Sequence, residues 1–350
     1  MATIRDVARA AGVSIATVSA ILNGTARVSE RLTKRVWEAI DATGYSPDGV
    51  ARSLRLGRTS SIGLVVGDIS NPFFTSLAKA VESRASEAGY LVIVTNTDEH
   101  PDRELKLLKL LREQRVAGVI LAPSGHDMEY LSALSLLKNS PVVLVDRHLP
   151  DASFESVIVD NVAAARMVTD YLIRLNHRRI AMVIGKQHLW TTEQRLRGFH
   201  ESLAAAGISP DFTLELSANS RIESAYDAVQ HLLNMPNRPT AIFAANNLMM
   251  LGAIEAIMDM GFRCPEDVSL AGIDDFPWIS AIRPQLTTVA QPIEELGKVA
   301  VERLLDQIEG GRSRDTEQSH ERKVSVLEPR LLIRDSCARP AAEPAQDQAR

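Results

Sequence analysis

Residues 3–23 have the sequence TIRDVARAAGVSIATVSAILN. The apolar residues of the first half follow the i, i+3, i+4, i+7 spacing of an amphipathic helix; they are Ile4, Val7, Ala8 and Ala11. Gly12 permits the positive φ of a tight turn, and Ser14 is a residue type that caps a helix. A second helix is expected over 15–22, with Val18, Ile21 and Leu22 facing inward. The stretch therefore predicts a helix-turn-helix.

In a helix-turn-helix that binds DNA, the outer face of the second helix is the surface that enters the major groove. It would present Ile15, Ala16, Thr17, Ser19 and Ala20. An ordinary helical hairpin has the same spacing, so charge is the second observation. Residues 1–60 contain nine Lys and Arg against five Asp and Glu, a net charge of +4, in a chain whose total is −5. A basic head on an acidic body favours contact of the head alone with phosphates.

A short hinge follows the head. Ser46 is a good N-cap, Pro47 suits the first position of a helix, and Asp48 favours the positive end of the helix dipole. The expected helix, from 47 to about 56, is too short to be stable alone in water. A flexible link over 57–61 would join it to the rest of the chain.

These stretches closely resemble the head of LacI/GalR-type transcriptional regulators. The matching head segments are 3–8, 11–14, 17–19 and 22–23, and segments 45–47, 51–55 and 59–63 resemble the hinge and the entry to the core. The resemblance spans about 2–333. It implies a homodimer that reads a palindromic operator with a flexible pyrimidine–purine step at its centre.

The resemblance also implies which residues contact DNA. Leu54 would be wedged between base pairs in the minor groove, with packing in a small core as the alternative. Ile15, Ala16 and Ala20 carry no hydrogen-bonding side chains, unlike the polar residues of the best-known members, so base discrimination depends on the hydroxyl residues, Arg55 and DNA shape. The expected DNA-binding residues are Thr3, Ser14, Ile15, Ala16, Thr17, Ser19, Ala20, Asn23, Arg52, Leu54 and Arg55.

From residue 62 onward, apolar strand-like runs alternate with helical patterns, which is typical of parallel sheets with crossover helices. The expected strands are 62–66, 91–95, 119–122, 142–145, 180–184, 241–244 and 268–273, and the expected helices are 77–88, 104–113, 163–175, 196–206 and 248–260. The fold class is thus α/β: an all-α helix-turn-helix head (1–46), a hinge helix and linker (47–60), and two doubly wound parallel-sheet lobes of the periplasmic-binding-protein type (61–333).

The family pattern has three crossings between lobes, expected here near Asn161, Gln291 and Arg322. Lobe one would then comprise about 61–160 and 292–322, and lobe two about 161–291 and 323–333. The stretch 334–350 is rich in Ala, Pro and Gln, which predicts disorder. It lacks a leucine heptad, which argues against a tetramerising coil.

Composition narrows the class of protein. The two cysteines, Cys264 and Cys337, lie far apart without metal-ligand spacing, which favours a reduced compartment. Neither an apolar run of about 18 residues nor a signal peptide is apparent, so we expect a cytoplasmic protein. His177 is explained by a helix-ending turn at Asn176 without a metal. The sequence predicts no metal site, no cofactor and no catalytic constellation, and hence no enzyme.

Polar residues follow several of the expected strands. In open α/β sheets, ligands bind beyond the carboxyl ends of the strands. Carboxylates, amides and arginine exchange hydrogen bonds with hydroxyl groups, and phenyl faces cover the apolar side of a sugar ring. The segments are Asn71-Pro72-Phe73-Phe74, Asp146-Arg147, Asn246-Asn247, Asp274-Asp275 and Gln291. Their convergence predicts a polyhydroxylated ligand.

The same segments resemble those that contact the sugar in the family's effector core and in ribose-type periplasmic proteins. Arg195 stands three residues before Gly198-Phe199, as that pattern requires, whereas Asn247 replaces the usual aspartate. Trp190 is expected on a loop, either as a stacking platform for the ligand or as a packed side chain. The expected effector-binding residues are Asn71, Phe73, Phe74, Asp146, Arg147, Trp190, Arg195, Asn246, Asp274 and Gln291.

The favoured interpretation is a sequence-specific DNA-binding repressor controlled by a sugar-like effector in the cleft between the lobes. Induction and corepression are both compatible with such linkage. Two alternatives remain: a sugar-binding protein without a direct regulatory role, and a corepressor-dependent repressor that responds to a non-sugar metabolite. An α/β sugar-modifying enzyme is disfavoured because no catalytic constellation is apparent.

Overall fold

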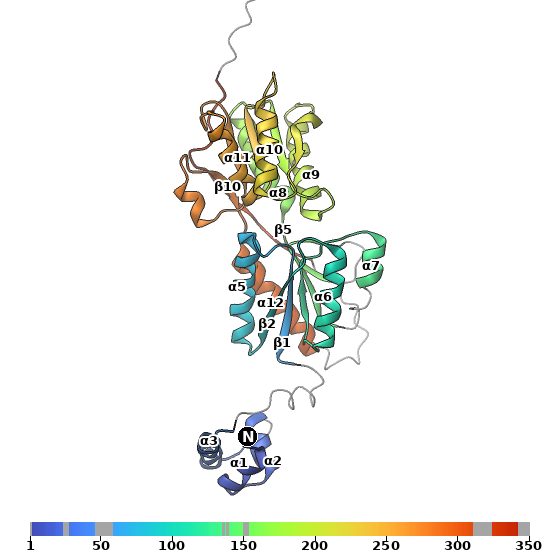
Figure 1. Ribbon diagram of the computed structural model, residues 1–350, viewed down its shortest axis with the longest axis vertical. Coiled ribbons are helices and arrows are strands. Elements are labelled where there is room, and N and C mark those ends of the chain that lie inside the picture. The colour runs from blue at the N-terminus through green and yellow to red at the C-terminus, as the bar shows by residue number, and fades with distance from the viewer. Residues whose placement is uncertain are drawn as a thin grey trace, which may run out of the picture. The chain divides into compact units, whose positions relative to one another are not determined.

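The computed structural model describes residues 2–23, 28–45, 59–134, 137, 140–149, 154–310 and 324–341. The chain divides into two compact units, Met1–Thr59 and Ser60–Arg350 (Figure 1). The expected hinge helix, with Arg52, Leu54 and Arg55, lies outside the described residues. None of the described helices is both long enough and apolar enough to cross a membrane.

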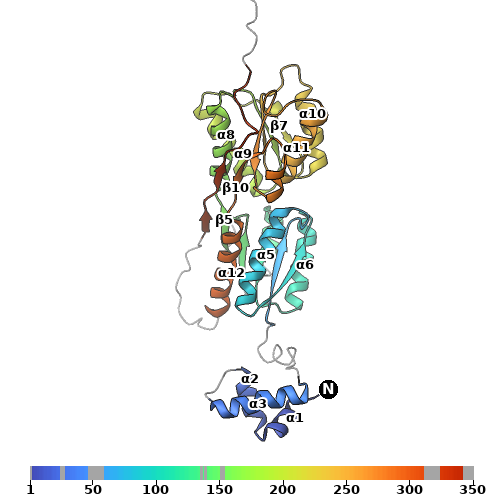
Figure 2. The ribbon, with the colours of Figure 1, turned by 90° about the vertical axis from the view of Figure 1, so that its left-hand side faces the viewer.

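In the first unit, the residues that the structure describes form three helices, α1 (Ile4–Ala11), α2 (Ile15–Asn23) and α3 (Glu30–Thr43) (Figure 2). The carboxylate of Asp6 accepts hydrogen bonds from the backbone N–H and the hydroxyl of Thr3, which caps α1. Gly12 has the positive φ expected of the turn, 61°. The small core contains Val7, Ala8, Ala11, Val18, Val36, Ala39 and Ile40. Helix α3 therefore covers the inward faces of the helix-turn-helix.

The described part of the second unit contains two six-stranded sheets, which confirms the doubly wound architecture. The first has the order β11-β5-β4-β3-β1-β2, with parallel pairing throughout. Its strands are β1 (Ser61–Val66), β2 (Leu91–Asn96), β3 (Val119–Leu121), β4 (Val142–Val145), β5 (Glu155–Val159) and β11 (Val324–Leu327). Strands β1, β3 and β4 are buried along their whole length, as expected for strands covered on both faces.

The second sheet repeats this order as β12-β10-β9-β8-β6-β7, with only β12 antiparallel to its neighbour. Its strands are β6 (Ile180–Ile184), β7 (Glu215–Ser217), β8 (Ala241–Ala244), β9 (Ser269–Ile273), β10 (Thr287–Ala290) and β12 (Arg330–Leu332). The sequence did not predict β5, β7, β10, β11 and β12. Strands β7 and β12 have only three residues each, whereas β5 and β10 are largely buried and were missed despite their apolar residues.

Helices cover both faces of the sheets (Figure 1). In lobe one they are α5 (Pro72–Glu87), α6 (Pro101–Glu113), α7 (Met128–Leu134) and α12 (Ile293–Gly310), and in lobe two α8 (Asn161–Arg174), α9 (Trp190–Ala205), α10 (Ile222–Leu233) and α11 (Asn247–Asp259). Leu64 on β1 packs in the cluster that contains α5 and α12, whereas Val65 packs against α6. Successive side chains of one strand thus face opposite layers.

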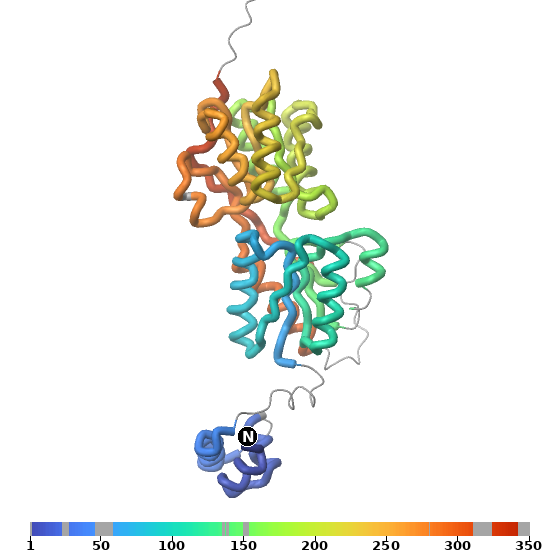
Figure 3. The backbone as a smooth tube through the Cα atoms, in the orientation of Figure 1, coloured from blue at the N-terminus to red at the C-terminus, as the bar shows by residue number. Residues whose placement is uncertain are grey.

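Within the described residues, the chain passes between the lobes three times (Figure 3). The passages lie at Asp160, between β5 and α8, at 291–292, between β10 and α12, and at 328–329, between β11 and β12. The last was expected near Arg322, before β11. That boundary is wrong because β11 pairs with β5 in lobe one, so the chain returns only after Leu327.

The stretch after β12 is packed against the second sheet as far as Ala338, so the expectation of disorder is wrong for 334–338; residues 342–350 lie outside the described ranges. Ser336 is fully buried, donates to the carbonyl of Leu270 and accepts from the backbone N–H of Thr287. His177 lies between Thr240 Oγ1 and the carbonyl oxygen of Ala338, 2.8 Å from each. Composition alone could not show that this segment forms hydrogen bonds with residues of β9 and β10.

Candidate functional site

The outer surface of α2 presents small and apolar side chains. Ser14, Ile15 and Ala16 are exposed, while Thr17, Ser19 and Ala20 are half-buried. Ser14 caps the helix as expected, since its Oγ accepts from the backbone N–H of Thr17 at 3.1 Å. The hydroxyls of Ser14 and Thr17 are also 2.9 Å apart and bond to each other. Thr3 is exposed at the start of α1, and the side chain of Asn23 lies outside the described set.

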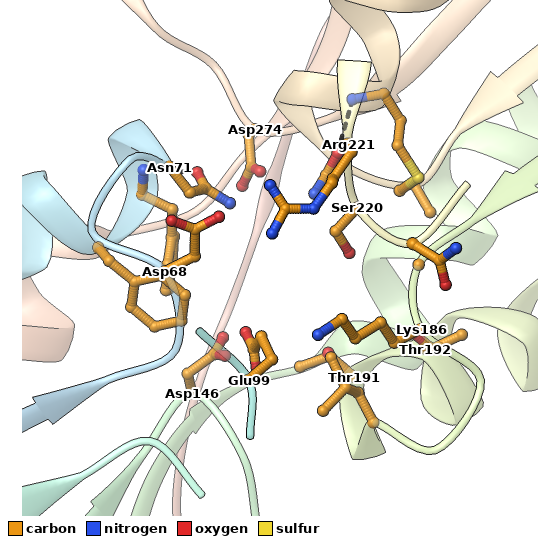
Figure 4. A pocket seen from close by; sticks show the side chains of 18 of the residues that line it. Asp68, Asn71, Glu99, Asp146, Lys186, Thr191, Thr192, Ser220, Arg221 and Asp274 are labelled. Carbon is orange, nitrogen blue, oxygen red and sulfur yellow. Dashed lines mark hydrogen bonds between the residues drawn. The ribbon is translucent and has the colours of Figure 1, made fainter. Parts of the chain in front are cut away.

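A cavity lies between the two lobes of the second unit, with a volume of about 700 Å³ including the part open to solvent (Figure 4). Nine of the ten effector residues predicted from the sequence line it: Asn71, Phe73, Phe74, Asp146, Arg147, Arg195, Asn246, Asp274 and Gln291. The ends of parallel strands from both sheets meet here, which is why residues distant in the sequence converge.

Trp190 does not line this cavity. It is the first residue of α9 rather than part of a loop, and its ring packs edge-on against His148 with 6.5 Å between centroids. In this structure Trp190 is therefore a packed side chain and not a platform that faces the cavity. Its neighbours Thr191 and Thr192 line the cavity instead.

Several lining residues were not predicted: Asp68, Asp98, Glu99, Gly185, Lys186, Leu189, Thr191, Thr192, Asn219, Ser220, Arg221, Ala245 and Met249. Asp98 and Glu99 follow β2, so the strand-end rule could have found them. Lys186 lies just after β6, so the same rule could have identified it. Arg221 follows β7, a three-residue, partly exposed strand whose sequence gives little signal.

In lobe one, Arg147 and Glu99 form a buried two-pronged ion pair. Arg147 Nη1 lies 2.6 Å from Glu99 Oε2, and Nη2 lies 2.7 Å from Oε1. Arg147 also donates to the carbonyl of Pro123 and stands 5.9 Å from the ring centre of Phe74. Burial alone would lower the pKa of Arg147, but Glu99 raises it above the ordinary value. The side chain of Arg147 is therefore held in place by Glu99 and Pro123 of the protein itself.

Asp146 lies beside this pair, with its Oδ2 3.3 Å from Arg147 Nε. Burial raises the pKa of Asp146 to about 6, while Arg147 and Arg195 act in the opposite direction. The residue has φ 68°, a left-handed conformation that is uncommon outside glycine, although Asp and Asn adopt it more readily than other residues do. Backbone strain at a buried carboxylate in a cavity is typical of a functional position.

In lobe two, Arg195 is buried, and no carboxylate among the described residues forms an ion pair with it. Its Nε donates to Asn161 Oδ1 at 2.7 Å, and Nη1 donates to the carbonyl of Ala245. Burial lowers the pKa of Arg195, whereas Asp274 and Asp146 raise it. Gly198 lets α9 approach α8 closely, because an added Cβ would lie 2.3 Å from the carbonyl oxygen of Val162.

Asn247 joins the lobes directly. Its Nδ2 donates to Asn71 Oδ1 of lobe one and to Asp274 Oδ2 of lobe two, both at 2.9 Å. Gln291 also donates to Asp274. An aspartate at 247 would place a second carboxylate against Asp274, so the departure from the family pattern is what permits this bond. Asn246, the preceding residue, caps α11 by accepting from Met249 N–H at 2.8 Å.

Asp275, by contrast, is not among the residues that line the cavity. It accepts from Thr288 Oγ1 and pairs with Arg334 at 2.7 Å. The cavity as a whole therefore offers carboxylates, amides, guanidinium groups and two phenyl rings to a ligand. Such a set can bind a polyhydroxylated molecule by hydrogen bonds and stacking.

Comparisons with known proteins agree with this arrangement. Residues 59–331 match the family described as periplasmic binding proteins and sugar binding domain of the LacI family. Residues 3–48 match the bacterial regulatory proteins of the lacI family. Together the two matches cover the head and both lobes.

Individual relatives span nearly the whole chain. The HTH-type transcriptional repressor PurR of Aliivibrio salmonicida is 36% identical over 339 residues, which cover 96% of this chain and 99% of the relative. The lac repressor dimer bound to operator and the anti-inducer ONPF is 28% identical, with a TM-score of 0.86 over 96% of this chain and 99% of that one. The complex of the transcriptional regulator CelR with cellobiose is 31% identical, with a TM-score of 0.71 over 96% and 100%.

The helix-turn-helix head, the paired α/β lobes and the cavity at their strand ends are thus the parts of a single regulatory architecture. The chain belongs to the LacI family of bacterial regulatory proteins and is a DNA-binding transcriptional regulator with a ligand-binding core.

Proposed function

We propose that this chain is a repressor that binds a palindromic operator as a homodimer and releases or tightens its hold when a sugar or sugar derivative occupies the cavity between the lobes. The control by a ligand is supported above all by one observation, which is that nine of the predicted effector-binding residues line a single cavity. The role is binding rather than catalysis, and it is exercised on DNA in the cytoplasm.

The head supports operator binding through the exposed start of α2. Ser14, Ile15 and Ala16 are exposed on a helix whose other side is held by α1 and α3. Among the relatives, the lac repressor structure is a dimer bound to operator. A palindrome matches the two-fold symmetry of such a dimer. In this proposal Arg52, Leu54 and Arg55 belong to the hinge that contacts the minor groove.

The core supports control by a ligand because its cavity takes side chains from both lobes. A ligand that contacts Asp146 in lobe one and Asp274 in lobe two stabilises one angle between the lobes over another. Operator affinity changes only if the two angles differ in their affinity for DNA, and the coupling is reciprocal. The sign, release or tightening, follows from which angle the ligand prefers.

A polyhydroxylated ligand fits the lining. The carboxylates of Asp146 and Asp274 accept hydrogen bonds from hydroxyls, Arg195 donates, and Phe73 and Phe74 supply apolar faces. Among the relatives, the CelR structure is a complex with cellobiose.

Two measurements test the proposal with the full chain. The first selects binding sites from a pool of random DNA; a palindromic consensus bound by dimers is expected, and the absence of any selected sequence would refute operator binding. The second measures melting temperature with pentoses, hexoses, sugar acids, sugar phosphates and nucleosides. A ligand at a hundred times its Kd adds about 2.7 kcal/mol of stability. A compound that stabilises the protein must then change its affinity for the selected DNA.

A further inference from the structure

Three basic side chains line the cavity from lobe two: Lys186 after β6, Arg195 on α9 and Arg221 just before α10. Within the described ranges, none of the three forms an ion pair. Figure 4 shows the Lys186 ammonium and the Arg221 guanidinium pointing into the cavity. Lobe two therefore presents positive charge to any occupant.

Most of the hydrogen-bond donors of these side chains are unused. Lys186 donates to the carbonyl of Asp98 at 3.3 Å. The Arg221 guanidinium makes no hydrogen bond with the part of the chain that the structure describes. An ammonium has three donors and a guanidinium five. The lobe-two wall can thus accommodate several further acceptor atoms.

The carboxylates that line the cavity from lobe one form more hydrogen bonds and ion pairs with the protein than these basic side chains do. Both oxygens of Glu99 are bound by Arg147, and Asp98 pairs with an arginine outside the cavity. Asp68 Oδ1 accepts from the backbone N–H and the hydroxyl of Ser70, at 2.9 and 2.6 Å. In the cavity, the carboxylate acceptors of lobe one are thus already hydrogen-bonded within the protein, whereas most of the donors of lobe two are not.

Lys186 and Arg221 also carry the same charge and point into the same cavity, so the charge of Arg221 disfavours the charged form of Lys186. Burial lowers the pKa of Lys186 below its ordinary value, and Arg221 and Arg147 lower it further, while Glu99 and Asp68 act in the opposite sense. An anionic group between the two cations would relieve this repulsion. A neutral sugar would leave it in place.

We infer that the effector is an anionic sugar, whose hydroxyls bind at Asp146 and Asp274 while its carboxylate or phosphate lies between Lys186 and Arg221. This inference rests on the proposed function, because it names the ligand class of the same cavity. The planar guanidinium matches either anion with two parallel hydrogen bonds, and the ammonium adds a point charge. Arg195, held deeper by Asn161, is left to bind a hydroxyl.

The test uses matched sets of compounds with the full chain: glucose, gluconate and glucose 6-phosphate, and ribose, ribonate and ribose 5-phosphate. Calorimetric titration at low and high salt gives each affinity. In at least one set, the charged compound is expected to bind about tenfold or more tightly than its neutral parent, with an affinity that falls as salt rises. The carboxylate and phosphate members distinguish the two anions.

Variants locate the effect. Lys186→Gln and Arg221→Gln should each weaken binding of the charged compound by about tenfold and leave the neutral parent unchanged. Lys109→Gln removes the same charge from an exposed position on α6 and should change neither affinity. A neutral parent that binds as tightly as its charged derivatives would overturn the inference, and so would a panel in which no charged compound binds. Selection of operator DNA without any effector tests the proposed function separately.

Discussion

Asp146 and Asp274 occupy equivalent positions in the two lobes. Asp146 directly follows β4 and Asp274 directly follows β9, the third strands of two sheets with matching order. Both residues are left-handed, with φ of 68° and 81°. Since both line the same cavity (Figure 4), the internal repeat of the fold directs two carboxylates with left-handed backbones into that cavity, one from each lobe.

The first prediction concerns Asp274→Asn. Asparagine tolerates the left-handed conformation, so the backbone is retained while the charge is lost. A hydrogen bond to a charged group contributes roughly 1.5–3 kcal/mol, so effector affinity should fall by about tenfold or more while operator binding persists. Calorimetry with the ligand and fluorescence anisotropy with operator DNA measure the two quantities.

Asp275→Asn is the matched control for that variant. Asp275 pairs with Arg334 and accepts from Thr288, and it does not line the cavity. Its substitution should lower the melting temperature and leave ligand affinity intact. If Asp274→Asn binds the ligand as tightly as the unaltered protein, the effector role of Asp274 is refuted.

A second prediction addresses the bridge between the lobes. Asn247→Asp removes the donor to Asn71 and sets a second carboxylate against Asp274. Because Asn247 is fully buried, we expect a loss of about 2–4 kcal/mol in the free energy of unfolding. Asn246→Asp retains a helix cap at the adjacent position and should cost less than 1 kcal/mol, roughly. Urea unfolding compares them; equal losses would show that the bridge contributes nothing.

The sequence predicted the parts of the site that depend on local pattern. Continuous apolar runs such as 142–145 revealed the central strands. The convergence of parallel strand ends predicted that Asn71, Asp146 and Asp274 lie together. Arg221 was missed because β7 is short and partly exposed. The Asn71–Asn247 bond depends on the angle between the lobes, which no local pattern encodes.

A third prediction uses the buried carboxyl of Glu104 on α6. It accepts from the backbone N–H of Ser124 at 2.8 Å and from the hydroxyl of Tyr130. Burial raises the pKa of Glu104 from 4.5 to about 7, although both bonds and Arg147 act against the rise. The folded state therefore holds a proton that the unfolded state loses. This contribution to stability is complete below pH 4.5 and is lost as pH rises through 7, on the order of 3 kcal/mol.

Glu104→Gln cannot titrate, so its stability should fall less between pH 4.5 and 7 than that of the unaltered protein. Urea unfolding across this pH range measures the difference. Asp146, with a pKa of about 6, contributes in the same direction to both proteins and cancels in the comparison. Glu113→Gln, at the exposed end of α6, should keep the original pH dependence. Parallel curves for all three proteins would contradict the assignment.

A fourth prediction concerns Ile15, which is 44% exposed at the start of α2. An exposed isoleucine costs little stability to remove, but at a recognition helix it can contact thymine methyl groups. Ile15→Ala should weaken binding to the selected operator by about three- to tenfold, as measured by anisotropy. Hydrogen exchange of the α1–α3 amides should stay unchanged. Val18→Ala, at a fully buried position, should instead destabilise the head by about 2 kcal/mol.

The last prediction concerns Leu54, which lies outside the described residues and whose role is inferred from the family resemblance. If Leu54 is wedged between base pairs, Leu54→Ala removes the apolar contact that offsets the cost of unstacking them. Operator affinity should fall by more than about tenfold, while the melting temperature of the core and its ligand affinity stay the same. A variant that retains full operator affinity would remove the wedge; one that also lowers core stability would favour the alternative, in which Leu54 packs inside the protein.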